Sequence, residues 1–504
     1  MATGTLISLA LYFITMLAIG LYAYRKSTSD MQEYMLGGRN LSPKVTALSA
    51  GASDMSGWML MGVPGAMYVS GFSSAWIAIG LTIGAYLNYV FVAPRLRVYT
   101  EKAKNAITIP DFFENRFNDT SRTLRVVSSV VIIVFFTLYT SSGVVAGGKL
   151  FESSFNTSYE LGLYITAGVV VAYTLFGGFL AVSMTDFVQG CIMFISLVLV
   201  PVVVMMELGG FGETVAVLQT QNENLTNLMV DAASNQALGA MAIISLMAWG
   251  LGYFGQPHII VRFMAIRHVR EMKVARRIGM SWMIVSLIGS MATGLFGLAY
   301  AVKTGSFDGD PETIFIFLSQ ILFHPLIAGF LLAAILAAIM STISSQLLVT
   351  SSSLTGDIYH AFLRKEASQK ELVLMGRISV AIVALVAIYL AYDRDSTILT
   401  LVSNAWAGFG AAFGPIILFS LFWKRMTRMA AIAGMLVGAI TVLFWIYAPV
   451  TIGGQSLSAW MYEIVPGFLA CSLTIVVVSL LSNEPDAELQ ATFDAVDAEL
   501  REHL

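Results

Sequence analysis

Long apolar stretches, separated by short polar segments, follow one another along almost the whole chain. A helix needs about 20 predominantly apolar residues to cross the hydrocarbon core of a bilayer, and by this measure the pattern predicts about thirteen spans. They are centred on residues 5–24, 45–68, 73–95, 124–150, 158–178, 186–206, 238–260, 278–302, 314–356, 376–392, 397–423, 429–447 and 461–481. The ninth stretch is too long for one span and predicts an additional amphipathic piece at one end. The pattern is typical of an all-α polytopic membrane protein whose transmembrane domain occupies residues 1–481.

The composition agrees with this class and narrows the partners. Hydrophobic residues make up 57% of the 504 residues and charged residues 12%, against about 25% charged in a soluble domain. The expected surroundings are a lipid bilayer, and the net charge of −3 gives no reason to expect a nucleic-acid partner. Cys191 and Cys471 both lie in apolar runs and predict neither a disulfide framework nor a metal site. The first span lacks the basic leading region and cleavage pattern of a signal peptide, so we expect a retained helix.

Basic residues occupy alternate loops. All but three of the 28 Lys and Arg residues fall on one set of sides, and the exceptions are Lys149, Lys303 and Arg394. Because Lys and Arg are retained in the cytoplasm, we expect the N-terminus outside and the C-terminus inside. Arg262 begins one of the predicted inner loops, whereas the short loop predicted at residues 177–186 has no basic residue and is placed by parity alone. The acidic, amphipathic stretch 482–504 is then a cytoplasmic tail.

One carboxylate lies in the middle of the second predicted span. Asp54 has no Lys, Arg or His within nine residues, and a lone charge at the bilayer centre costs roughly 2.5–3.5 kcal/mol. The neighbouring Gly51 and Gly57 permit local unwinding, which is tolerated at membrane depth where the backbone is buried in protein or lines a wet cavity. The stretch predicts a broken helix that binds a cation or a polar solute. The alternative is a carboxylate that only holds two helices together.

A second glycine-rich interruption lies five spans further on, at residues 249–258. By parity, one interrupted helix points inward and the other outward, as in transporters built from two inverted halves. Chance is the alternative, since Gly and Pro are common in membrane helices.

Hydroxyl groups and aromatic rings supply candidate ligands. Ser341 and Thr342 lie in the long ninth stretch, where hydroxyls most often join helices or bond to their own backbone. Together with carbonyls of the interrupted helix around Asp54, they would form the all-oxygen shell that a hard alkali cation prefers. Aromatic faces would attract a desolvated ammonium group, unless these rings only form core or interfacial belt. The aromatic candidates are Trp58, Tyr139, Trp249 and Tyr253.

Four motifs resemble those of the sodium:solute symporter family. They are the Gly-Gly stretch at residues 173–181 and the runs at 46–58, 248–258 and 406–415. The resemblance implies a leucine-transporter-like fold with an inverted five-plus-five repeat at about 45–423, an extra helix at about 5–24 and two further helices at about 429–481. It also implies a bacterial plasma (inner) membrane location and sodium-coupled uptake of L-proline by alternating access, with Na⁺ as the coupling ion and no other cofactor.

The resemblance also assigns roles to individual positions. It implies that sodium is bound by the carbonyls of Ala52, Met55 and Ala338 and by the hydroxyls of Ser341 and Thr342. Asp54 and Asp186 match acidic residues of sodium coupling, Asp186 on the inner exit route, and direct contact between Asp54 and the ion stays open. The positions implied for proline are Ser56, Gly57, Trp58, Tyr139, Trp249 and Tyr253. Ser345 departs from the Cys of close family members, which affects the wall beside the ion site.

Other functions stay open at this point. A different small organic solute would use the same architecture, a passive channel would need a continuous polar pore, and a sensor would need a signalling domain larger than the tail. An enzyme is not expected, because the sequence contains no nucleophile–base–acid constellation and no phosphate-cradling glycine loop.

Overall fold

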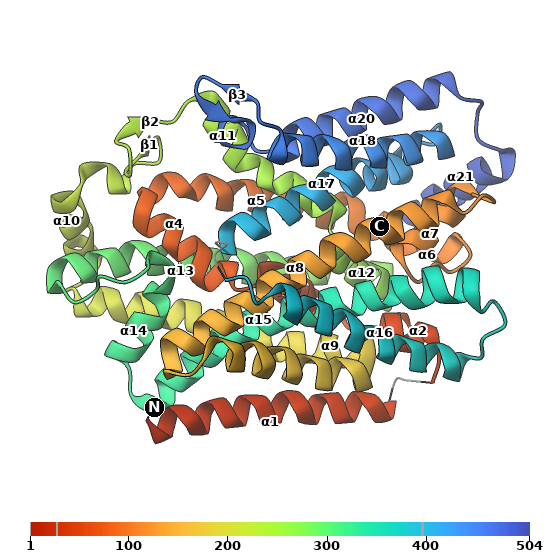
Figure 1. The fold of residues 1–504 in the computed structure, drawn as a ribbon. Helices are drawn as coiled ribbons and strands as arrows, with labels where there is room; N and C mark the ends of the chain where they lie inside the picture. Colours follow the sequence, from red (N-terminus) through yellow and green to blue (C-terminus); the bar gives the residue numbers. More distant parts are fainter. Residues whose placement is uncertain (1, 27–28, 395–397) are drawn as a thin grey trace.

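The computed structural model describes residues 2–26, 29–394 and 398–504. Figure 1 shows a bundle of long helices that run in roughly one direction, with two short hairpins toward one end. Within the described residues, ten helices are long and apolar enough, by length and composition, to cross a membrane; one of them is the joined helical stretch Trp58–Lys102, and the other nine correspond to the long helices named below. This agrees with the polytopic class, while the count of thirteen spans stays a prediction.

The long helices follow one another along the chain. They are α1 (Thr3–Lys26), α8 (Thr123–Phe155), α9 (Tyr159–Glu207), α13 (Met272–Thr304), α15 (Pro325–Ser352), α16 (Gln369–Leu390), α17 (Ile398–Phe422), α18 (Arg428–Tyr447) and α20 (Ile464–Leu481). The shorter helices are α2 (Met31–Leu36), α3 (Pro43–Met55), α4 (Val63–Ser70), α5 (Ala75–Leu87), α6 (Ala93–Lys102), α7 (Ile109–Phe117), α10 (Phe211–Gln221), α11 (Ala240–Met247), α12 (Pro257–Ala265), α14 (Ile314–Leu322), α19 (Leu457–Trp460) and α21 (Ala487–His503).

Short 3-10 or π-helical segments and two hairpins complete the fold. The short helical segments are η1 (Gly37–Arg39), η2 (Trp58–Gly62), η3 (Gly71–Ser74), η4 (Asn88–Val92), η5 (Glu223–Thr226), η6 (Ala248–Gly255), η7 (Val269–Glu271), η8 (Pro311–Thr313) and η9 (Ser353–Leu363). The antiparallel hairpins are β1 (Val230–Asp231) with β2 (Gln236–Ala237), and β3 (Thr451–Ile452) with β4 (Gln455–Ser456).

Helix α9 corrects one sequence prediction. The loop predicted at residues 177–186 is wrong, because these residues are helical and the interruption is confined to Gly178 (φ 60°, ψ −146°). A Cβ at this position would lie 2.6 Å from the Tyr34 carbonyl oxygen. A straight helix of 49 residues would be about 70 Å long, more than twice the roughly 30 Å of a bilayer core. The bend at Gly178 therefore divides α9 into two segments that correspond to the predicted fifth and sixth spans.

The long ninth stretch is divided as predicted. A separate short helix, α14, precedes α15, and α15 continues directly into the π-helical segment η9. One face of α14 is buried, whereas Gln320 and Ile321 are exposed.

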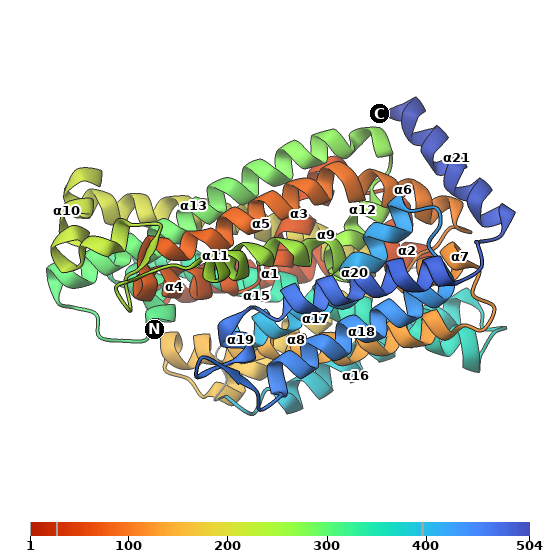
Figure 2. The ribbon, with the colours of Figure 1, turned by 90° about the horizontal axis from the view of Figure 1, so that it is seen from above.

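The acidic tail forms the amphipathic helix α21, as predicted. Its buried face consists of Phe493, Val496 and Leu500. On its outer side Asp494 pairs with Lys424 (2.8 Å), one of the basic residues assigned to the inner side. Figure 2 shows α21 near α6, whereas the start of α1 lies toward the other end of the bundle. The termini therefore lie toward opposite ends, as an odd number of spans requires.

Two interrupted helices lie side by side and run in opposite directions. The first consists of α3, η2 and α4, and the second of α11, η6 and α12. Just before α3, the Leu41 amide donates to the Ala265 carbonyl at the end of α12 (3.1 Å). At the other end, Ala232 in the segment leading to α11 donates to Ser70 at the end of α4 (3.1 Å). The start of each interrupted helix thus lies beside the end of the other, as an inverted repeat predicts.

Candidate functional site

The first helix break lies at Ser56. Helix α3 ends at Met55, and Ser56 has φ 52°, a left-handed conformation that non-glycine residues seldom adopt. The Ser56 hydroxyl accepts a hydrogen bond from the Trp58 amide (3.2 Å). The predicted break in this helix is confirmed, and it lies at Ser56 and Gly57.

Gly51 has a different role from the one predicted. It lies inside α3, where a Cβ would be 2.7 Å from the Trp282 ring. Gly51 therefore allows α13 to pack closely against α3, and it does not unwind the helix.

Four of the five predicted sodium ligands lie together between α3 and α15. The Ser341 hydroxyl donates to the carbonyl of Ala52 (2.7 Å) and approaches that of Ala338 (3.1 Å). The Thr342 hydroxyl also approaches the Ala338 carbonyl (3.2 Å). The fifth residue, Met55, is buried at the end of α3, and within the described residues no hydrogen bond joins it to the other four. The hypothesis that the broken helix lies beside the Ser-Thr pair is confirmed.

Asp54 lies on another side of α3 from this oxygen cluster. Its Oδ2 accepts a hydrogen bond from the Tyr253 hydroxyl on η6 (2.5 Å). Within the described residues Asp54 forms no ion pair, although it is buried. Since successive residues of a helix are about 100° apart, Asp54 projects on nearly the opposite side from Ala52. The carboxylate therefore contacts η6, whereas the Ala52 carbonyl contacts α15.

The predicted aromatic residues form one cluster around the two breaks. The rings of Trp58 and Trp249 stack with their centroids 5.6 Å apart, and Tyr462 stacks on Trp249 from α20's side (5.3 Å). A small cavity of about 10 Å³, the room of roughly one water, lies beside them. Its lining includes Ser56, Trp58, Tyr139 and Trp249. The indole nitrogen of Trp58 is buried and has no hydrogen-bond partner among the described residues.

The other two residues that the sequence predicts to bind proline, Gly57 and Tyr253, lie next to this cavity. Gly57 faces α15, where a Cβ would be 3.1 Å from Ile339. Tyr253 packs edge-on against Trp406 (5.1 Å) and lines a neighbouring small cavity with Asp54.

Trp406 and Tyr462 belong to the cluster although the sequence did not single them out as ligands. The Trp406 indole donates to the Trp249 carbonyl (2.8 Å), and the Tyr462 hydroxyl donates to the Ser403 carbonyl (2.6 Å). Trp406 is the first residue of the family-like motif at residues 406–415, and its place in that motif could have identified it as part of the site. Tyr462 lies outside these motifs.

Asp186 forms a buried ion pair with Arg262, a residue that the sequence analysis placed in an inner loop. Arg262 instead lies within α12 and is fully buried. Its guanidinium lies 3.2 Å from Asp186 Oδ2, and the Ser49 hydroxyl donates to the same oxygen (2.7 Å). The Arg262 guanidinium also donates to the Ser345 hydroxyl (2.6 Å). An arginine between two apolar triplets of one helix, at residues 259–261 and 263–265, is the signal that could have identified it.

Ser345 therefore connects the two parts of the site. Its hydroxyl donates to the Ser341 carbonyl (2.8 Å) and accepts from Arg262. The position where this sequence departs from close family members lies between the oxygen cluster and the Asp186–Arg262 pair.

Comparison of the sequence with known proteins identifies the family of this chain. The model of the sodium:solute symporter family matches residues 34–438. The osmoregulated proline transporter OpuE of Bacillus subtilis is 58% identical over 485 residues, covering 96% of each chain. The sodium/proline symporter of Staphylococcus aureus is 53% identical over 503 residues, covering 99% of this chain and 96% of the other.

A solved structure shows the same fold. It is described as the substrate-bound outward-open state of a Na⁺-coupled sialic acid symporter. The two structures match with a TM-score of 0.81 at 19% identity, over 96% of this chain and 99% of the other. At that identity the match establishes the leucine-transporter-like fold alone. From the family model and the two relatives together, we conclude that this chain belongs to the sodium:solute symporter family.

Proposed function

We propose that the protein couples the inward movement of Na⁺ to the uptake of L-proline by alternating access. Relatives that cover nearly the whole chain carry the names proline transporter and sodium/proline symporter. The observation that carries the proposal is the hydrogen bond from the Ser341 hydroxyl of α15 to the Ala52 carbonyl of the interrupted helix, with the Thr342 hydroxyl beside it on the Ala338 carbonyl of its own helix. Such a shell of neutral oxygens suits an alkali cation.

In this proposal Ala52, Met55, Ala338, Ser341 and Thr342 hold the sodium ion. The hydroxyl and carbonyl oxygens of Ser341 and Ala52 are already 2.7 Å apart. When an ion binds between them, the Ser341 hydroxyl keeps its hydrogen but turns it away from the Ala52 carbonyl, and the ion takes the place of the hydrogen bond in drawing the two oxygens together. Binding of Na⁺ then ties α15 to the inner half of the broken helix, and this supports an ion-dependent change between access states.

In this proposal L-proline binds at the same helix break, on the side of the aromatic cluster formed by Trp58 and Trp249. Trp58 and Trp249 form an apolar, electron-rich wall for the ring and the secondary ammonium. Tyr139, Tyr253, Ser56 and Gly57 complete the proposed set. The unpartnered Trp58 indole donates to the proline carboxylate. Because the cavity holds only about 10 Å³, proline entry requires these walls to separate.

The proposed topology places the N-terminus outside and the C-terminus in the cytoplasm of a bacterial cell, with 45–423 as the inverted-repeat core. The distribution of Lys and Arg supports it. A passive channel is the weaker alternative, since a cavity of about 10 Å³ is not a continuous pore. A symporter for another small solute keeps the sodium site and differs at the aromatic walls.

The direct test is uptake of labelled proline into proteoliposomes containing the purified protein, with an inward sodium gradient or with choline in place of sodium. We expect accumulation above the outside concentration only with the sodium gradient. Equilibration without accumulation contradicts symport. Sodium-driven uptake of another solute in preference to proline contradicts the assignment of substrate.

A further inference from the structure

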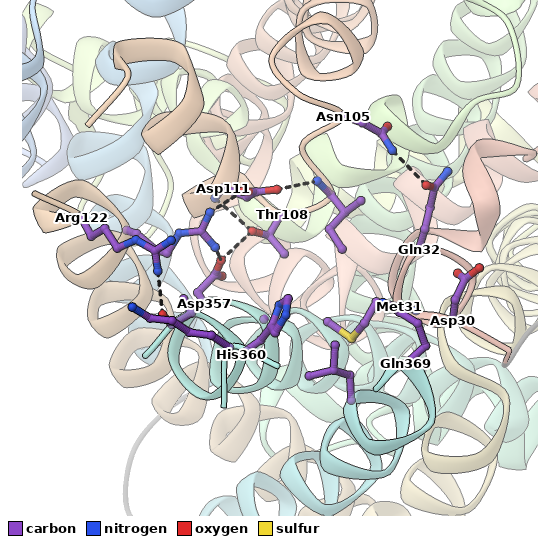
Figure 3. Close-up of a pocket in the computed structure, with 16 residues that line it drawn as sticks. Asp30, Met31, Gln32, Asn105, Thr108, Asp111, Arg122, Asp357, His360 and Gln369 are labelled. Atoms are coloured by element: carbon purple, nitrogen blue, oxygen red, sulfur yellow. Dashed lines mark hydrogen bonds and ion pairs between the residues drawn. The ribbon is translucent and has the colours of Figure 1, made fainter. Parts of the chain in front are cut away.

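A large cavity lies at the end of the bundle where α2, α7 and η9 meet. Its volume is about 720 Å³, and its lining carries groups of both charges. Figure 3 shows Thr108, Asp111 and Asp357 together at one side of it, with Asp30 and Gln32 at the other. This cavity is separate from the small cavity at the aromatic cluster.

One face of α15 and η9 leads from the oxygen cluster to this cavity. Ser341 and Ser345 lie at its start, beside Ala52 and Arg262. Residues spaced three or four positions further on line a second small cavity, and the next ones line the large cavity. In order along this face these residues are Leu348, Val349, Ser352, Ser353, Gly356 and Asp357. Ile107 and Thr108 line both this second small cavity and the large cavity, so the two are adjacent.

Asp357 lies at the end of this face and is only half satisfied. Its side chain is 1% exposed. Its Oδ1 accepts hydrogen bonds from Thr108 (3.0 Å) and from Arg125 (3.0 Å). Its Oδ2 has no hydrogen bond of good geometry among the described residues, and the Ser353 hydroxyl one turn earlier, which also lacks one, lies close enough to stabilise the carboxylate. A buried carboxylate oxygen without a partner is costly, so this oxygen points to a ligand.

The charges around Asp357 favour one added positive charge. Arg125 pairs with Asp357 and also with Asp111 and Glu114, and Arg122 lies 3.5 Å from Glu114. Three carboxylates therefore face two guanidinium groups. The other charged groups that line the cavity, Asp30 and Lys365, have opposite signs and cancel. Arg39 adds a weaker, more distant positive charge near Asp111, so the directly paired groups leave room for one monovalent cation at most.

We propose that Asp357 and Ser353 form an inner station for the transported alkali cation, between the main sodium site and the cytoplasm. Arg125 and Thr108 hold Oδ1 and fix the carboxylate, which leaves Oδ2 free for the ion. The ion leaves the Ser341–Thr342 shell, follows the face of α15 and is held at Asp357 before release into the cavity. This inference rests on the proposed sodium coupling and names a further residue on the ion's route.

The test uses a cysteine beside the proposed station. Gly356→Cys is suitable because a Cβ there meets only the Met31 methyl group, at 3.4 Å. The background carries Cys191→Ser and Cys471→Ser, since the chain has 2 cysteines. The full-length protein in lipid nanodiscs is labelled with a polar maleimide in NaCl or in choline chloride of equal ionic strength. Sodium at about twice its dissociation constant slows labelling about threefold if the station is occupied.

Four variants decide the outcome. Asp357→Asn should abolish the protection by sodium, whereas Asp357→Glu and the exposed-site control Glu366→Gln should keep it. In Thr342→Ala, which weakens the main site, protection should persist. Equal labelling in both salts, protection retained in Asp357→Asn or protection lost in Thr342→Ala overturns the station. Absence of sodium-driven proline uptake, with protection intact, overturns the proposed symport and leaves the station standing.

Discussion

Asp54 and Asp186 are both buried among membrane helices, yet their surroundings differ in one respect. Asp186 pairs with the buried Arg262 (3.2 Å) and accepts from Ser49 (2.7 Å). Among the described residues, Asp54 accepts only from Tyr253 and no cationic side chain pairs with it. One carboxylate is compensated within the protein, and the other lacks a compensating charge.

This difference separates two uses of a buried charge. A compensated pair needs no external ion to balance its charge, so the Asp186–Arg262 contact can stabilise the packing of α9 against α12 by itself. A carboxylate without a partner of opposite charge gains most when a cation arrives from outside the protein. We infer that Asp54 responds to sodium through charge, whereas the Asp186–Arg262 pair holds α9 against α12 and leaves Asp186 Oδ1 without a hydrogen-bond partner among the described residues.

The largest expected effect is that of Asp54→Asn, or of Asp54→Ala. Asp54 and the proposed ion lie on different sides of α3, and two unit charges about 8 Å apart still interact by about 2 kcal/mol at an effective dielectric constant of 20, an attraction that the amide forfeits. We expect loss of sodium-driven proline uptake in proteoliposomes. The asparagine still accepts from Tyr253, so the thermal unfolding temperature should stay near that of the unaltered protein. Substantial sodium-driven uptake by Asp54→Asn would remove the distinction between the two carboxylates.

Arg262→Ala should act mainly on stability. It leaves Asp186 buried without a cation, and breaking a buried ion pair in this way costs about 3–5 kcal/mol. We expect a clearly lower unfolding temperature in detergent. The double variant Asp186→Leu with Arg262→Met removes both charges and should recover most of the loss. If the double variant is as unstable as Arg262→Ala, the pair is not what stabilises α9 against α12.

Trp249→Ala and Tyr139→Ala should affect proline more than sodium. Each removes an aromatic wall of the small cavity, and an aromatic contact is worth about 0.5–1.5 kcal/mol. We expect the KM for proline to rise up to about tenfold, or uptake to be lost, while sodium binding measured on the purified protein persists. Unchanged proline kinetics in both variants would show that the rings only pack.

The smallest expected effects are those of the oxygen cluster opposite Asp54. Ser341→Ala and Thr342→Ala each remove one neutral ligand, and at about 0.6 kcal/mol per membrane hydrogen bond this raises the half-saturating sodium concentration roughly threefold. Thr342→Ser keeps the oxygen and should change it less. The measurement is sodium-dependent proline binding to each purified variant. Unaltered sodium dependence in both alanine variants would assign these hydroxyls to helix packing.

Much of the fold follows from the sequence because membrane insertion depends on a local, one-dimensional property. The apolar stretches, the amphipathic tail and the divided ninth stretch need only their own residues to be recognised. The helix break after Met55 can also be predicted, since glycines three residues to either side of a lone carboxylate are unusual inside a span. The exact position cannot, because Gly51 and Gly57 look alike in sequence, and only the Trp282 ring shows that Gly51 serves packing.

The tertiary structure alone decided how the chemistry is distributed. The sequence placed Arg262 in a loop by its charge, and it took the fold to bring Asp186 within 3.2 Å of it. The sequence placed Asp54 beside Ala52, yet the helical twist directs one toward η6 and the other toward α15. Hydrophobic patterning acts along the chain and is therefore readable from it. The pairing of charges and ligands acts through space between segments far apart in the chain, 289 residues for Ser341 and Ala52 and 402 for Arg95 and Asp497.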